Sequence, residues 1–152
     1  MKARVRASLI FAICVAAIAL TSTIVSGQAG GRAGPQVPPP PGFQVKVALI
    51  LPLSGFGQDW GEHTRDGALI VIQEAQAAGW DIQTVLADSE CDGEAAVDAA
   101  NQVIFTDTVN YIVGAVCSSA SIPISDIAEA NHVVQISPVS TDPRVTTHDD
   151  GT

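Results

Sequence analysis

Four short apolar runs divide the chain, at residues 45–51, 82–87, 111–116 and 133–137. They are mostly apolar runs of the buried type rather than clean alternations of apolar and polar positions. Such runs are typical of strands in a parallel sheet that is covered on both faces. The pattern therefore predicts four parallel strands.

Between these runs, apolar residues recur every three or four positions, which predicts amphipathic helices. The first helix is expected to start near Trp60 and to end at Gly79, because glycine favours the position after a helix. Its predicted inward positions are Thr64, Gly67, Ala68, Val71, Ile72, Ala75 and Ala78.

Two further helices are predicted. The second follows Asp92, whose carboxylate suits the N-cap, and has Glu94 in its first turn. Its predicted inward positions are Ala96, Val97, Ala100, Val103 and Ile104. The third, a shorter helix, is expected to follow Ser119 or Ser121, with Pro123 tolerated in its first turn.

This alternation of strands and helices predicts the α/β class, with a doubly wound parallel sheet. In such sheets, ligands bind at the carboxyl ends of the strands. Those ends are the four loops at residues 52–61, 88–92, 117–121 and 137–143, and the polar residues gather there. Candidate functional residues are therefore sought in these four loops.

The N-terminus has the features of an export signal. Three basic residues, Lys2, Arg4 and Arg6, precede an uninterrupted apolar run at residues 9–20. That run is shorter than the roughly 20 residues that span a bilayer. We predict a cleaved signal peptide at residues 1–27, with an uncleaved anchor as the alternative. A Pro/Gly-rich linker follows at 28–43, and a folded region at 44–152.

Charge and cysteine content narrow the function classes. The chain has 16 acidic and 7 basic residues, a net charge of −9, which disfavours binding to nucleic acid or anionic lipid. Export would leave Cys91 and Cys117 as an even pair, which predicts a disulfide. A cysteine enzyme is disfavoured because no histidine is placed to serve as a base, and the Gly-x-Ser-x-Gly elbow of hydrolases is absent.

Two loops begin motifs that they do not complete. Gly55 and Gly57 start a G-x-G pattern, but Trp60 stands where a dinucleotide fingerprint needs its third glycine. The loop at 88–92 opens like a calcium loop, but its twelfth position is Ala99 rather than glutamate. We therefore predict neither a nucleotide cofactor nor a metal.

The remaining loop residues leave alternatives open. Trp60 either forms a wall of a binding surface or packs as a core residue at the helix start. Ser118 and Ser119 either hold an anionic group together with the N–H groups of the following helix, or cap that helix. Ser140 and Thr141 belong either to a ligand site or to an ordinary turn.

Together, the loops and their flanking elements resemble one family. The matching segments are VALILPLSG (47–55), WG (60–61) with DGA (66–68), DSECD (88–92), GAVCSS (114–119) and ISPVSTDP (136–143). In order and spacing they resemble the N-terminal lobe of the periplasmic leucine/isoleucine/valine-binding proteins, the substrate-binding subunits of branched-chain amino-acid ABC transporters. The resemblance implies a Rossmann-like lobe of a type I periplasmic binding protein, with Cys91 and Cys117 matching the family's disulfide.

The resemblance also implies residue roles. Ser118 and Thr141 resemble the residues that bind the amino acid's α-carboxylate, and Val139 the residue whose carbonyl accepts from the α-ammonium. The full set of candidate ligand-binding residues is Trp60, Ser118, Ser119, Val139, Ser140 and Thr141. Val139-Ser140 replaces a pair of small apolar residues that is more usual in the family.

The implied function is that of a monomeric periplasmic solute-binding protein, without catalysis or cofactor, whose partners are ABC transporter permease subunits. Its ligand would be a branched-chain or related aliphatic amino acid, or a small amide. The alternative is a ligand-sensing domain of the same fold in a receptor or regulator. Members of the family close a second lobe over the ligand. The chain is therefore expected to be an incomplete lobe that binds weakly or not at all alone.

Overall fold

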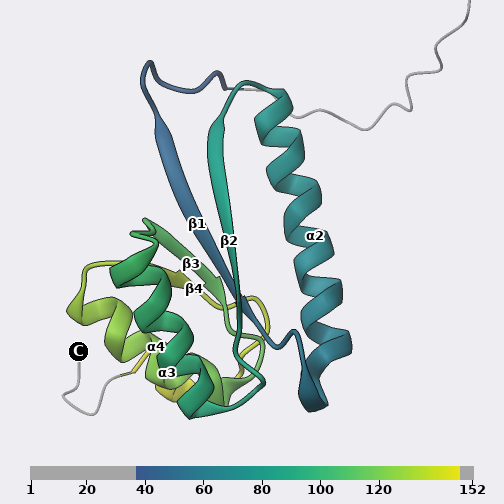
Figure 1. The fold of residues 1–152 in the computed structure, drawn as a ribbon, viewed down its shortest axis with the longest axis vertical. Coiled ribbons are helices and arrows are strands. Elements are labelled where there is room, and N and C mark those ends of the chain that lie inside the picture. The colour runs from purple at the N-terminus through teal and green to yellow at the C-terminus, as the bar shows by residue number, and fades with distance from the viewer. Residues whose placement is uncertain (1–36, 148–152) are drawn as a thin grey trace, which may run out of the picture. The chain divides into compact units, whose positions relative to one another are not determined.

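A computed structural model describes residues 37–147, which form a four-stranded, all-parallel sheet with strand order β2-β1-β3-β4 (Figure 1). The strands are β1 (Gln44–Leu51), β2 (Asp81–Asp88), β3 (Tyr111–Gly114) and β4 (Val134–Ile136). The predicted doubly wound α/β fold is confirmed. The predicted signal peptide and residues 28–36 of the predicted linker lie outside the described residues.

β3 ends at Gly114, two residues earlier than predicted. Gly114 has a φ of 141°, and a Cβ at this position would overlap the carbonyl oxygen of Ile50 on β1. The chain therefore leaves the hydrogen-bonded ladder at this glycine. As a result, residues 115–117 form a loop that leads into the next helix.

The helices cover the two faces of the sheet. α2 (Gln58–Ala77) lies on one face, and α3 (Gly93–Asn101) and α4 (Ser118–Ala130) lie on the other (Figure 1). Asp92 caps α3 as predicted, because its Oδ1 accepts hydrogen bonds from the N–H groups of Glu94 at 2.8 Å and Ala95 at 3.0 Å. A π-helix at Gln102–Thr106 continues α3.

The prediction for the start of α4 was wrong. The helix begins at Ser118, directly after Cys117, so Pro123 is its sixth residue and lies beyond the first turn. A proline there removes one N–H, the one that would bond to the carbonyl of Ser119. The helix continues through this position, with Ile124 and Ala128 buried on its inner face.

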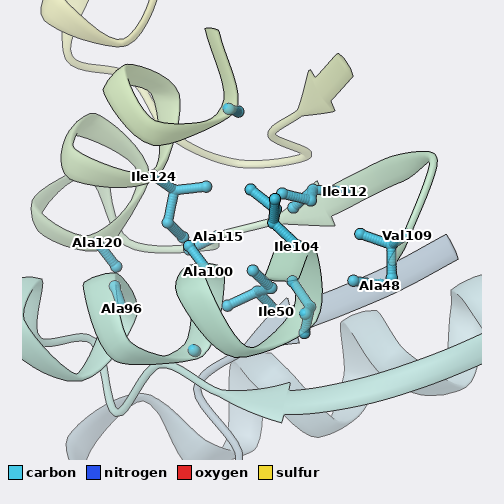
Figure 2. Packing of buried hydrophobic residues seen from close by; sticks show 13 residues of the cluster. Ala48, Ile50, Ala96, Ala100, Ile104, Val109, Ile112, Ala115, Ala120 and Ile124 are labelled. Atoms are coloured by element: carbon cyan, nitrogen blue, oxygen red, sulfur yellow. The ribbon is translucent and has the colours of Figure 1, made fainter. Parts of the chain in front are cut away.

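The larger core lies between the sheet and the α3–α4 layer (Figure 2). Side chains from β1 and β3, such as Ala48, Ile50 and Ile112, meet those of α3 and α4 there. The predicted inward positions of the second helix are confirmed for the buried residues Ala96, Ala100, Val103 and Ile104. The π-helix contributes the last two of these.

The smaller core lies beneath α2, where Leu49 and Leu51 of β1 contact Ala68 and Leu69. Here the predicted inward stripe was partly wrong, since Val71 is 64% exposed and Gly67 is also exposed. Leu69, which was not on the predicted stripe, packs against the core instead. A single helix resting on a twisted sheet buries a narrower stripe than a helix with neighbours on both sides.

The expectation that all strands are covered on both faces holds for β1 but not for the sheet edges. β2 and β4 each pair with one neighbour, and Leu86, Val134 and Ile136 are 46–60% exposed. Their apolar runs therefore do not reflect full burial in this part of the chain. Among the described residues, no helix is long and apolar enough to cross a membrane.

Candidate functional site

Asp88, at the carboxyl end of β2, ties the first two loops together. Its Oδ1 accepts hydrogen bonds from the N–H groups of Leu53 at 2.7 Å and Glu90 at 2.9 Å. Burial acts to raise the pKa of Asp88, but hydrogen bonds from the Ser54 side chain and from neighbouring N–H groups outweigh it and leave the pKa lowered. Sequence reasoning placed Asp88 in a failed calcium loop and in a segment that matches the family, and missed this structural role.

A disulfide joins the second loop to the third. Cys91 and Cys117 are paired as expected, with their Cα atoms 5.3 Å apart. Gly57 of the first loop packs directly on this bridge, since a Cβ there would overlap Cys91 Sγ. The hydroxyl of Ser119 donates to the Cys91 carbonyl at 2.9 Å. The first three loops are therefore held together at one end of the sheet.

The N-terminus of α4 presents donors at this end of the sheet. Cys117 is the N-cap residue of α4, and its side chain makes no capping hydrogen bond. Its carbonyl accepts from the N–H groups of Ala120 and Ser121, at 3.1 and 2.9 Å. Within residues 37–147, the N–H groups of Ser118 and Ser119 have no acceptor. These unpaired N–H groups and the positive end of the helix dipole together favour the binding of an anion at the start of α4.

The fourth loop lies against this helix end through Ser118. Ser118 Oγ accepts from the N–H groups of Thr141 at 3.2 Å and Asp142 at 3.3 Å. Because a hydroxyl has two acceptor lone pairs and one proton, the Ser118 proton is left for donation. Thr141 Oγ1 and the carbonyl oxygen of Val139 have no hydrogen-bond partner within the described range. The structure thus joins Ser118 to Thr141, and Val139 lies two residues earlier in the same loop.

Two of the candidate hydroxyls are committed to other partners. Ser119 Oγ donates to Cys91, as described, whereas its N–H group has no acceptor within residues 37–147. Ser140 Oγ lies 2.7 Å from Ser121 Oγ, which is fully buried. Ser140 therefore points into the end of the sheet rather than toward the cluster formed by Ser118 and Thr141.

Trp60 lies in the first turn of α2 and is 55% exposed, so the alternative of a core tryptophan was wrong. Its ring makes an edge-to-face contact with Phe56, with centroids 5.6 Å apart and planes at 89°. Phe56 is 88% exposed and was missed by sequence reasoning, which had no partner to assign to it. The pair forms an exposed apolar surface in the first loop and at the start of α2, in the edge-to-face geometry that aromatic rings favour.

The polar cluster is open to solvent. A hollow of about 440 Å³ lies behind the fourth loop and includes Ser140, Thr141 and Asp142, but neither Ser118 nor Trp60 lines it. Asp142 is paired with Arg144, whose side-chain and backbone N–H groups lower the pKa of that carboxyl to about 2. Within the described residues, no group of three or more His, Cys, Asp or Glu side chains could hold a metal ion.

The arrangement of these loops is typical of a domain that binds a small molecule. A doubly wound α/β domain presents helix N–H groups, hydroxyls and a carbonyl at the carboxyl ends of its strands, with an aromatic wall beside them. These groups are suited to hold a small molecule that carries both an anionic and a cationic group. They include neither a nucleophile with a base nor a metal site among the described residues.

Comparison with known proteins assigns the family. Residues 44–150 match the model of a periplasmic binding protein family, and the chain belongs to this family. The chain is 38% identical over 106 residues to the leucine-, isoleucine-, valine-, threonine-, and alanine-binding protein of Pseudomonas aeruginosa, covering 67% of this chain and 28% of the relative. It is 34% identical to the Leu/Ile/Val-binding protein of Escherichia coli, covering 67% and 29%.

A solved structure agrees with this assignment. The crystal structure of a leucine binding protein from Thermotoga maritima superposes with a TM-score of 0.64 at 36% identity, covering 67% of this chain and 29% of that one. The chain therefore spans less than a third of the length of the relatives it matches.

Proposed function

We propose that the chain supplies the amino-acid-binding surface of an extracytoplasmic solute-binding protein of an ABC transporter. Its ligand would be a branched-chain or related aliphatic amino acid, and it would bind without catalysis or cofactor. The names of the relatives in Pseudomonas and Escherichia support this ligand class. The observation that carries the proposal is the contact between Ser118 and the loop that bears Val139 and Thr141, beside the unpaired N–H groups at the start of α4.

In the proposed complex, the α-carboxylate lies at the N-terminus of α4. It accepts from the Ser118 hydroxyl, from the free N–H groups of Ser118 and Ser119, and from the Thr141 hydroxyl. Neutral donors at a helix N-terminus hold a carboxylate without a buried cation. The α-ammonium donates to the Val139 carbonyl, which has no other partner within residues 37–147.

The aliphatic side chain of the ligand would extend toward Trp60, whose ring is half exposed beside the first loop. An open surface holds only part of a small ligand, whereas most small-molecule sites enclose 70–90% of the ligand's surface. We therefore expect weak binding to this chain. The remaining contacts would have to come from a region equivalent to the part of the relatives that the chain does not match.

The proposal includes export and a transport partner. Residues 1–27 would act as a cleaved signal peptide and residues 28–43 as a linker, which places the folded region of a monomer in the periplasm. Permease subunits of the transporter would then be its protein partners. Mass spectrometry of the exported protein tests this part, since retention of residue 1 in the mature product would contradict cleavage.

The test of ligand binding is an NMR titration of the full chain with L-leucine, L-isoleucine and L-valine. We expect saturable shifts of the amide resonances of Ser118, Ser119 and Thr141, and no comparable shifts with leucinamide, which lacks the carboxylate. A Trp80→Phe variant leaves Trp60 as the single tryptophan, so its fluorescence reports on the aromatic wall. If the chain is folded and these amides do not respond to any of the three amino acids, the proposal is wrong.

Two serine variants form a matched pair. Ser118→Ala removes a hydroxyl that donates to the carboxylate, and we expect affinity to fall about 10-fold or more, as for a hydrogen bond to a charged group. Ser119→Ala removes a hydroxyl that is committed to Cys91 and leaves the N–H group in place. We expect this variant to bind nearly as well as the wild type, and equal losses in the two variants would contradict the assigned roles.

A further inference from the structure

Ser140 lies between the two loop residues, Val139 and Thr141, that the proposed function uses most directly. Its side chain points away from them and into the sheet end, where its Oγ lies 2.7 Å from Ser121 Oγ. Its N–H group donates to Ser137 Oγ at 3.1 Å. Both the side chain and the main chain of Ser140 are thus fixed from behind the loop.

These bonds converge on one carbonyl oxygen. The carbonyl of Ala115 accepts from Ser137 Oγ at 2.7 Å and from Ser121 Oγ at 3.0 Å. Since a carbonyl oxygen has two lone pairs, these two donors satisfy it. The contacts of Ser140 Oγ with the carbonyls of Ala115 and Val116 are longer, at 3.3 and 3.4 Å.

The shorter distances favour one assignment of donors. Ser121 gives its proton to Ala115, so its Oγ accepts from Ser140 at the short distance. The result is a closed ring of hydrogen bonds. It runs from the Ser140 N–H group through Ser137, Ala115 and Ser121 back to the Ser140 hydroxyl. Ser121 and Ala115 are fully buried, so a broken ring would leave a polar group without water.

We propose that Ser140 is a positioning residue, whose hydroxyl bonds to Ser121 rather than to the ligand and so fixes the direction of the Val139 carbonyl and the Thr141 N–H group. The effect on ligand binding rests on the proposed function, in which the Val139 carbonyl accepts from the ligand's ammonium group. The Thr141 N–H group donates to Ser118, which would bind the carboxylate. The positioning role also accounts for the extra hydroxyl in Val139-Ser140, which does not add a polar group to the ligand surface.

The first measurement does not need a ligand. Amide hydrogen exchange followed by NMR on the full chain gives a protection factor for Thr141. We expect Ser140→Ala to lower it about 5- to 10-fold, the loss of roughly one neutral hydrogen bond. Ser121→Ala should act in the same way, and the double variant should be no worse than the stronger single variant, because both remove one shared bond.

A matched control and a rescue separate positioning from general stability. Ser125 donates its hydroxyl to the Ile122 carbonyl at 2.7 Å within α4; it lines the hollow behind the fourth loop but makes no hydrogen bond to that loop within residues 37–147. Ser125→Ala should therefore leave the protection factor of Thr141 unchanged even if it lowers the melting temperature. Ser140→Thr keeps the hydroxyl and should restore the wild-type protection factor.

The second measurement is the L-leucine titration of the same variants, in which Ser140→Ala should bind about fivefold more weakly. A Thr141 protection factor that is unchanged in Ser140→Ala overturns the inference. If leucine binding nevertheless falls, Ser140 is a direct ligand contact. If the wild type binds no leucine while its loop still responds to Ser140→Ala, the positioning role stands and the proposed function fails.

Discussion

Reduction of the Cys91–Cys117 disulfide should cost the chain a large part of its stability. The cysteines are 26 residues apart, so the bridge closes a loop of 27 residues when both are counted. Loss of the constraint on the unfolded chain corresponds to about 3.5 kcal/mol at 25 °C in the chain-entropy model. Since small domains are stable by roughly 5–15 kcal/mol, the reduced chain should keep about 1.5–11.5 kcal/mol and be close to unfolding at the low end of that range.

Urea denaturation followed by circular dichroism measures this difference, with and without a phosphine reductant. At an m-value of about 1–3 kcal/mol per molar urea, the midpoint should fall by about 1.2–3.5 M on reduction. Cys14→Ser in every sample prevents disulfide exchange, and a variant that also carries Cys91→Ser and Cys117→Ser should not respond to the reductant. If the free energy of unfolding changes by less than about 1 kcal/mol, the loop-closure reasoning is refuted.

Three further predictions concern single residues. Gly61→Ala should destabilise by about 1–3 kcal/mol, because its Cβ would overlap a carbonyl oxygen just after β1. Gly67→Ala, on the same helix but in open space, should be neutral or stabilising by up to about 1 kcal/mol. Urea midpoints decide both, and equal effects would contradict the packing argument. Asp88→Asn should cost about 1–2 kcal/mol at neutral pH. Because the pKa of Asp88 is lowered by folding, its contribution is present above the unfolded pKa and lost as the pH falls through the folded one, so the difference between wild type and variant should vanish in acid. Finally, an NMR titration should give Asp142 a pKa of about 2, and Arg144→Gln should raise it toward the ordinary value; an unchanged pKa would rule out the Arg144 side chain as the main cause.

Local patterns predicted the elements well where the physics is local. The N-cap carboxylate of Asp92 and the inward residues Ala96 and Ala100 follow from neighbours within one helix, and both predictions are confirmed. The start of α4 was mispredicted because proline preferences are statistical. The actual start at Ser118 follows the point at which β3 leaves the ladder, at Gly114.

The sequence by itself determined the α/β class, the order of the strands and helices, and the loops in which the polar residues lie. Hydrophobic periodicity and helix-capping chemistry are encoded over a few residues. Which hydroxyls face outward is decided only in three dimensions. Ser119 and Ser140 resemble ligand residues in sequence, but their hydroxyls bond to Cys91 and Ser121, from which they are separated by 28 and 19 positions. A serine hydroxyl bonds to whichever partner the fold brings within about 3 Å, and that partner is set by the packing of the whole sheet.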